Sequence, residues 1–479
     1  MRRRLTSITR RVCCTLRATR TRRSRCGCRP RGRSRRATTG ELRQCALNVV
    51  LERASTPVQA ALAWQLQAEV FNMCGEGRRA EVAARRGLDA LAGHAAPEVH
   101  ANLLADLGAA FWAQDRGVEA RDALEEAVRR LEPLGETEAL ASNLSSLAVV
   151  LDHQDRHREA EGYHRRACAL LERLGDTANL LVALRNLSVC LSDLGRVREA
   201  LGLLERARTL EGNAEGLWSS PTGHALLAFA YADLGEYSAA LASFAQARAL
   251  GERPHVWLPA YYRACEAEVW LTLGEVERAR PLLSAALDVP EMPDTFRLRA
   301  LLSLARLEVS RGEDGTDLLE TARALLDEGG GGRPLWRARY LLARAEASTP
   351  LEALRYAQGA LDVARTHELG QYELTAELRV TRALLTLGRH ADALTHAERA
   401  ARLLEHVTAA DMTRGEALLI VHDARRSNGR ADAAATLEDA RRWLRDTAER
   451  HVPEGARERF VRAHPVHRAL TNGATNANG

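Results

Sequence analysis

The sequence contains no lysine, and only two isoleucines, Ile8 and Ile420, occur among its 479 residues. Without lysine, the chain lacks the amine that binds phosphate in P-loop and kinase sites and the amine that forms a Schiff base. The composition therefore disfavours an ATPase or a kinase. Lysine and isoleucine have AT-rich codons, so the bias is typical of a GC-rich bacterial genome rather than of selection for arginine at binding sites.

Aromatic residues are also scarce, at 4% of the sequence, whereas Ala and Leu are abundant. Strands favour β-branched and aromatic side chains, and helices favour Ala and Leu, so the composition predicts an all-α protein. No apolar run has the length of a signal peptide or of a membrane-spanning helix. The nine cysteines are too few and too scattered for a disulfide framework. We therefore expect a cytoplasmic protein.

The first 40 residues differ from the rest of the chain in charge. They hold 15 arginines and no acidic residue, which leaves 53 basic and 63 acidic residues, a net charge of −10, in the remainder. Three interpretations stay open: a nucleic-acid-binding tail, an organellar transit peptide, and a misassigned translation start. The abrupt change of composition near Gly40 favours the third. The arm also holds Cys13, Cys14, Cys26 and Cys28, without the C-x-x-C spacing that is usual in zinc sites.

An internal period of 40 residues is the strongest pattern in the chain. Small residues recur in one column at Ala80, Ala120, Ala160, Ala200 and Ala240, and leucines in another at Leu107, Leu147, Leu187 and Leu227. A third column holds Leu124, Leu204 and Phe244, with His164 as the exception. Each period has the apolar spacing of two helices joined by a short turn, as in residues 180–192 and 197–210.

These columns resemble the tetratricopeptide repeat. One unit shows its signature as Leu227, Ala228, Tyr231, Leu234, Gly235, Ala240, Phe244 and Ala247. The resemblance implies an all-α fold, a right-handed superhelical solenoid of about ten helix-turn-helix units between Val58 and Arg450. Stacking is needed because one helix pair cannot bury its apolar face alone. The common unit has 34 residues, so the 40-residue period implies longer helices or longer connections.

The pattern predicts seven segments along the chain. They are an arm at 1–40, disordered or from a misassigned start, a lead-in at 41–57, regular repeats at 58–296, degenerate repeats at 297–361 with a Gly-rich linker at 329–332, further repeats at 362–450, a closing helix at 451–470, and a disordered tail at 471–479.

The 40-residue form resembles the repeat arrays of bacterial LuxR-type and SARP-type regulators with signal-transduction ATPase modules. Here no ATPase, winged helix or helix-turn-helix accompanies the repeats. The resemblance implies a protein-interaction scaffold, the sensor or docking component of a bacterial regulatory system, that binds a partner protein or peptide. The alternative is a nucleic-acid-associated regulator that uses the basic arm. Catalytic and cofactor motifs are missing from the sequence, so we expect neither an enzyme nor a bound cofactor or metal.

In the family, ligand contacts come from the first helix of each pair, on the concave face of the array. The corresponding positions here are Trp112, Ser142, Ser146, Arg185, Asn186, Val189, Asp193, Phe229 and Asp233. The adjacent pair Arg185 and Asn186 is predicted to hold an anionic or peptide-backbone group. His153 and His157 have a metal-ligand spacing, but their place in a turn favours solvated side chains.

Overall fold

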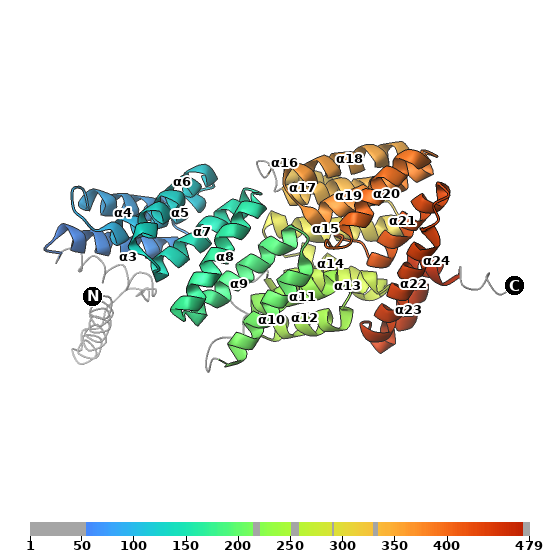
Figure 1. The fold of residues 1–479 in the computed structure, drawn as a ribbon, viewed down its shortest axis with the longest axis horizontal. Helices are drawn as coiled ribbons and strands as arrows, with labels where there is room; N and C mark the ends of the chain where they lie inside the picture. The colour runs from blue at the N-terminus through green and yellow to red at the C-terminus, as the bar shows by residue number, and fades with distance from the viewer. Residues whose placement is uncertain (1–53, 214–220, 251–257, 290–291, 329–333, 473–479) are drawn as a thin grey trace, which may run out of the picture. The chain divides into compact units, whose positions relative to one another are not determined.

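The computed structural model describes residues 54–213, 221–250, 258–289, 292–328 and 334–472 (Figure 1). The basic arm, most of the lead-in, the Gly-rich linker at 329–332 and residues 473–479 of the tail lie outside the described residues. Within the described ranges the chain forms 22 α-helices, two short 3-10 helices and no strand. Ten consecutive helix pairs run from Pro57 to Arg450, so the predicted all-α solenoid of helix-turn-helix repeats is confirmed.

The chain divides into two compact units, residues 1–146 and 147–479, called unit 1 and unit 2 below. The helices of unit 1 are α3 (Pro57–Met73), α4 (Gly77–Ala90), α5 (Pro97–Trp112), α6 (Gly117–Leu131), the 3-10 helix η1 (Glu132–Leu134) and the first part of α7 (Glu138–His153).

Unit 2 holds the rest of α7 and all later helices. They are α8 (His157–Leu174), α9 (Thr177–Asp193), α10 (Val197–Asn213), α11 (Pro221–Asp233), α12 (Tyr237–Leu250), α13 (Leu258–Thr272), α14 (Val276–Leu287), α15 (Asp294–Ser310), α16 (Thr316–Glu328), α17 (Pro334–Glu346), α18 (Pro350–Thr366), α19 (Gly370–Thr386), α20 (His390–Leu403), α21 (Arg414–Ser427) and α22 (Ala433–Arg450). The segment predicted to form one closing helix contains the 3-10 helix η2 (Glu454–Ala456), α23 (Arg457–Arg462) and α24 (Pro465–Asn472).

The repeat columns explain how the helices pack. The alanines of the first column are buried without measurable exposure, among them Ala160, Ala200 and Ala240 in unit 2. A methyl group at these positions lets neighbouring helices approach closely, and larger side chains such as Phe244 fill the remaining space. Gly235 ends the turn between α11 and α12 with φ of 83°, a left-handed conformation that favours glycine.

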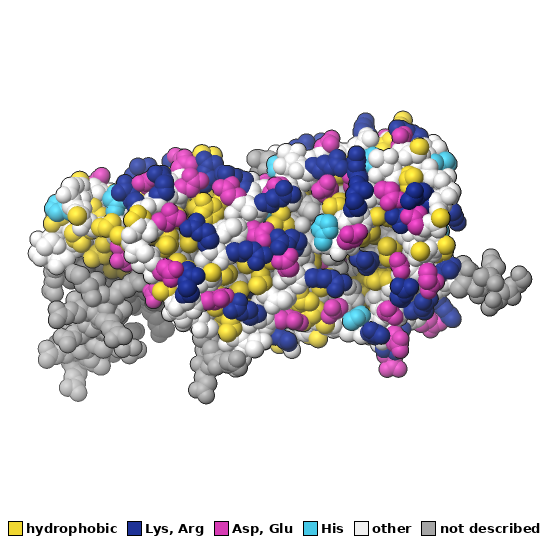
Figure 2. Space-filling model, viewed as in Figure 1, with side chains coloured by type: hydrophobic (Ala, Val, Ile, Leu, Met, Phe, Trp, Pro, Cys, Tyr) yellow, Lys and Arg dark blue, Asp and Glu magenta, His cyan; other side chains and the backbone are white. Residues whose placement is uncertain are grey.

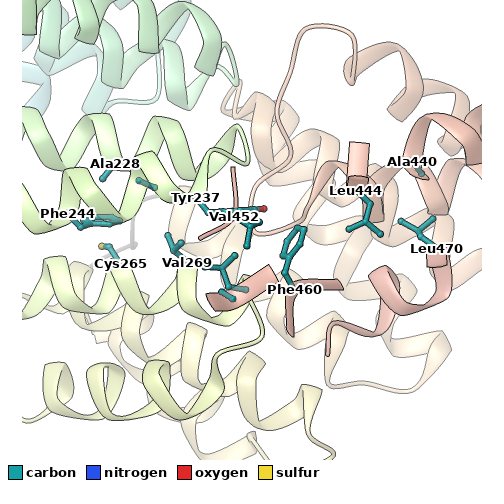
Figure 3. Packing of buried hydrophobic residues seen from close by; sticks show 13 residues of the cluster. Ala228, Tyr237, Phe244, Cys265, Val269, Ala440, Leu444, Val452, Phe460 and Leu470 are labelled. Atoms are coloured by element: carbon teal, nitrogen blue, oxygen red, sulfur yellow. The ribbon is translucent and has the colours of Figure 1, made fainter. Parts of the chain in front are cut away.

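Unit 2 also contains contacts between repeats that are distant in the sequence. One apolar core combines residues of α11, α12 and α13 with residues of the C-terminal helices α22, α23 and α24 (Figure 3). It is formed by Ala228, Tyr237, Ala240, Phe244, Cys265, Val269, Leu273, Ala440, Leu444, Val452, Ala456, Phe460 and Leu470. Stacking of each repeat on its neighbours does not by itself bring these helices together.

Backbone hydrogen bonds accompany this long-range core. The amide of Ser238 donates to the carbonyl of His451 at 2.8 Å, and the amide of Thr408 donates to the carbonyl of Gly195 at 3.2 Å. At Gly370, a Cβ atom would lie only 2.2 Å from the carbonyl oxygen of Leu194, so this approach requires glycine. The later repeats of unit 2 therefore pack against the turns of its earlier repeats.

None of the described helices has the length and apolar character needed to cross a membrane.

Candidate binding cavity

The long-range packing of unit 2 encloses a cavity of about 420 Å³. Helices α11, α13 and α15 line one part of it, and residues of α17, α21, α22 and α24 line another. Most of these helices are the first of their pair, so the cavity lies on the face where the family resemblance places ligand contacts. Its volume falls in the range of about 300–1,000 Å³ that is usual for ligand pockets.

A buried ion-pair network surrounds the cavity, with Arg339 of α17 at its centre. Only 3% of this side chain is exposed. Its Nη2 lies 2.6 Å from Oε1 of Glu268 and 2.7 Å from Oδ1 of Asp411, and its Nε donates to Oδ2 of Asp411 at 2.8 Å. The planar guanidinium thus binds Asp411 through two parallel hydrogen bonds and holds Glu268 at the same time.

Glu268 of α13 is the carboxylate that the network holds most tightly. Its second oxygen accepts a hydrogen bond from Nη2 of Arg299 at 2.6 Å, and the hydroxyl of Ser303 donates to the first. Burial alone would raise the pKa of Glu268, but Arg299 and Arg339 outweigh that effect and lower it to about 2. The guanidinium of Arg299 also lies 4.9 Å from the centre of the Phe229 ring.

The network continues on the side of α21. Arg306 binds Glu346 at 3.0 Å and donates to the backbone carbonyl of Asp411 at 2.7 Å. Arg379 pairs with Glu346 and, at 3.3 Å, with Glu416. Although burial raises the pKa of Glu416, the neighbouring arginines Arg379 and Arg382 lower it to about 2. The cavity wall therefore presents carboxylates and guanidiniums that are already held in fixed positions.

Asp233, the last residue of α11, lines the cavity as the carboxylate with the opposite pKa shift. The surrounding protein desolvates it and raises its pKa to about 6, although the amide of Gln371 donates a hydrogen bond to it at 3.2 Å. The nearby carboxylates of Asp411 and Glu268 add to the increase. The proton on Asp233 is thus exchanged near neutral pH.

This shift predicts a pH-dependent effect of Asp233→Asn. Because the pKa of Asp233 is raised in the folded state, the fold binds this proton more tightly than the unfolded chain, and ionisation destabilises the fold as pH rises from about 4 to about 6. The variant should therefore gain stability over the wild type at about pH 7.5 and gain less at about pH 4.5. Urea unfolding at both pH values measures the difference, with Asp439→Asn on the exposed face of α22 as the control. An equal gain at both pH values would contradict the assignment.

The structure brings only part of the predicted site together. Phe229 and Asp233 line the cavity. Asn186 and Asp193 are half-buried on α9, and Val189 on the same helix is exposed. In unit 1, the exposed residues Trp112, Ser142 and Ser146 lie on α5 and α7.

Arg185 has a different environment from the one predicted. It forms an ion pair with Glu211 of α10, and burial lowers the pKa of its guanidinium. Its side chain also packs within 3.2 Å of where a Cβ atom of Gly223 would stand. The acidic partner comes from the second helix of the same pair, and helix-A spacing alone does not reveal it. The guanidinium is therefore engaged inside the protein and is not open to an anionic ligand as predicted.

The prediction of solvated histidines in the turn after α7 is wrong for His157. His153 is exposed, but His157 is 1% exposed and binds Asp152. The turn is short enough that the first residue of α8 already points into the helix pair. His164, the exception in its column, is fully buried.

Sequence reasoning missed most of the network. One signal was available, because Glu268 occupies the column of Gly108, Ala148, Ser188 and Ala228, where every other residue is small. A carboxylate at a close-packing position needs buried positive partners, as Arg299 and Arg339 provide. The arginines themselves carry no such signal, since arginine is frequent throughout the chain.

The family model of the tetratricopeptide repeat matches residues 99–173 and 140–210. Residues 99–210 carry tetratricopeptide repeats. The tetratricopeptide array has no significant match among curated proteins. Among solved structures it is similar to apo NprR from B. thuringiensis, with 15% identity over 75% of this chain and 92% of that one and a TM-score of 0.47.

Two further structures show a comparable likeness to the tetratricopeptide array. One is NprR in complex with its cognate peptide NprX, with 16% identity over 68% of this chain and 93% of that one and a TM-score of 0.49. The other is BtubC from P. vanneervenii, with 21% identity over 46% of this chain and 95% of that one and a TM-score of 0.41. At these identities the likeness concerns the fold alone.

Proposed function

We propose that the chain is a binding protein that takes a short peptide segment of a partner into the cavity of unit 2. The observation that carries the proposal is the cavity itself, about 420 Å³ in volume and lined by fixed charges of both signs. A space of this size accepts a few residues of an extended chain and excludes a folded domain.

The chemistry of the wall suits a peptide. Glu268 and Asp411 face backbone amides or a chain amine as acceptors, whereas Arg299 and Arg306 supply donors for carbonyls or a carboxylate. Because each of these side chains is already held by a partner of opposite charge, little side-chain entropy is lost when a ligand binds. The wall also offers the Phe229 ring for an apolar side chain.

The proposal extends to a regulatory role, with the array as the sensor or docking component of a bacterial system. It includes a cytoplasmic location and binding without catalysis. The resemblance of the 40-residue period to the arrays of LuxR-type and SARP-type regulators supports this part of the proposal. A nucleic-acid surface is less well supported, because on the face in view acidic and basic side chains of the described residues alternate (Figure 2).

A substitution at the edge of the cavity tests the proposal. Ser310 is exposed, ends α15 and lines the cavity, and its hydroxyl bonds only to its own helix at the carbonyl of Leu307. Ser310→Trp should fill the entrance without disturbing the core. Ser427→Trp is the matched control: Ser427 is exposed, ends α21 and also bonds to its own helix, but it does not line the cavity.

The three proteins are incubated with the peptide fraction of an extract of the source cell, and retained peptides are identified by mass spectrometry. The wild type and Ser427→Trp should retain the same peptides, and Ser310→Trp should lose them while keeping its melting temperature. Retention of the same peptides by all three proteins would exclude the cavity as the binding site. Retention of none by the wild type would contradict peptide binding.

A further inference from the structure

One repeat of unit 2 carries metal-binding residue types where the other repeats carry apolar or small ones. Asp152 ends the first helix of this pair, His157 and His164 lie on α8, and Cys190 lies on the following helix α9. At one period's distance, His164 corresponds to Leu124, Leu204 and Phe244, His157 to Val197 and Tyr237, and Cys190 to Ala110, Val150 and Ala230. A polar set in core columns of one repeat indicates a specific role there.

All four side chains lie in the interior. Asp152 is 8% exposed, His157 1%, and His164 and Cys190 not at all. One donor atom from each of Asp152, His157 and Cys190 lies within 4.8 Å of the others. Oδ1 of Asp152 is 3.1 Å from Nδ1 of His157, and Sγ of Cys190 is 3.2 Å from the carbonyl oxygen of His157.

The hydrogen bonds inside this cluster do not satisfy all its polar atoms. Within the described part of the chain, Nε2 of His157 and Nδ1 of His164 are buried without a hydrogen-bond partner. Buried polar atoms of this kind are rare in folded proteins and call for an explanation, such as an ion that is not represented. A cation bound by the cluster would repay its burial.

We propose that Asp152, His157 and Cys190 bind a Zn²⁺ ion. A carboxylate oxygen, an imidazole nitrogen and a thiolate sulfur are the three ligand types of zinc in proteins, and zinc takes four ligands in all, so one place remains for a water molecule. Binding converts the thiol of Cys190 to a thiolate and releases its proton to solvent.

His164 acts as a positioning residue in this site. Its Nε2 donates to Oδ2 of Asp152 at 2.9 Å and so fixes the carboxylate whose other oxygen faces His157. Hydrogen bonds of this kind orient metal-bound carboxylates, and their loss typically weakens metal affinity by about 10- to 100-fold.

Cobalt(II) is the probe for the experiment, because it takes the place of zinc and absorbs visible light. Full-length protein is freed of metal with a chelator and titrated with Co²⁺. One equivalent should produce d–d bands typical of tetrahedral coordination and a thiolate-to-cobalt charge-transfer band, and Zn²⁺ should abolish both. The absence of these bands in the wild type would overturn the proposal.

Four variants test which residues bind the ion. Cys190→Ala introduces the residue found one period away and should remove the charge-transfer band, whereas Cys265→Ala, at another buried cysteine, should keep it. His164→Leu restores its column and should keep the fold by circular dichroism while weakening Co²⁺ binding about 10- to 100-fold. The double variant Cys26→Ser with Cys28→Ser should keep the band. Loss of the band in this double variant, or its persistence in Cys190→Ala, would assign the ion to other cysteines and overturn the proposal.

Discussion

Arg339→Met is expected to destabilise unit 2 by about 3–5 kcal/mol, because it leaves two buried carboxylates without their shared cation. Arg339 is 3% exposed and bonds to both Glu268 and Asp411. Methionine keeps much of the volume of the arginine stem, so the loss reports on charge rather than on a cavity. Urea unfolding at neutral pH, followed by circular dichroism, measures the change in free energy.

Arg382→Met provides the control for this prediction. Arg382 pairs with Glu416 at 3.1 Å, but 42% of its side chain is exposed. Ion pairs this open to solvent contribute about 1 kcal/mol or less, so the control should be close to the wild type. Equal losses for the two variants would show that the Arg339 network is hydrated and not a buried structural element.

Phe460→Ala is expected to cost a further large amount, about 3–5 kcal/mol, because it removes a buried ring from the core that joins α23 to the earlier repeats. Phe460 has no exposed surface. Its ring centre lies 5.7 Å from that of Tyr237 on α12 and 6.3 Å from that of Trp443 on α22 (Figure 3).

Phe460→Leu is the comparison for the alanine variant, since leucine refills most of the space and typically costs less than about 1.5 kcal/mol when a volume is conserved. Thermal and urea unfolding of both variants measure the two losses. A loss below about 1 kcal/mol for Phe460→Ala would mean that α23 contributes little to the fold.

Local spacing made the helices and the repeat predictable. The Ala160, Ala200 and Ala240 column marks close helix contacts within one period, so each unit could be recognised from about 40 residues of sequence. Such positions depend on neighbours in the sequence, and their burial follows from the period. The number of helix pairs followed in the same way.

The site was less predictable because its partners are distant in the sequence. Arg339 meets Glu268 and Asp411 at separations of 71 and 72 residues. Nothing in the helical period distinguishes these residues from charged residues on a solvated surface. The same reason explains Arg185, whose ion pair with Glu211 depends on how two helices cross. Only a break in a column, as at Glu268 and His164, indicates such a site in advance.

Closure of unit 2 around its cavity is the central structural claim, and two backbone amides report on it directly. The Ser238 amide lies in the first turn of α12, where helical amides have no partner within the helix, and it donates instead to His451. The Thr408 amide follows α20 and donates to Gly195. In an array with contacts only between adjacent repeats, both amides would face water.

Amide hydrogen exchange with residue-level fragmentation, on the wild type and on Phe460→Ala, is the measurement that tests closure most directly. Closure predicts slow exchange at Ser238 and Thr408 in the wild type, and faster exchange at Ser238 in the variant, because α23 then holds the segment around His451 less firmly. Exchange of both wild-type amides as fast as in unstructured peptides would contradict closure and, with it, the cavity.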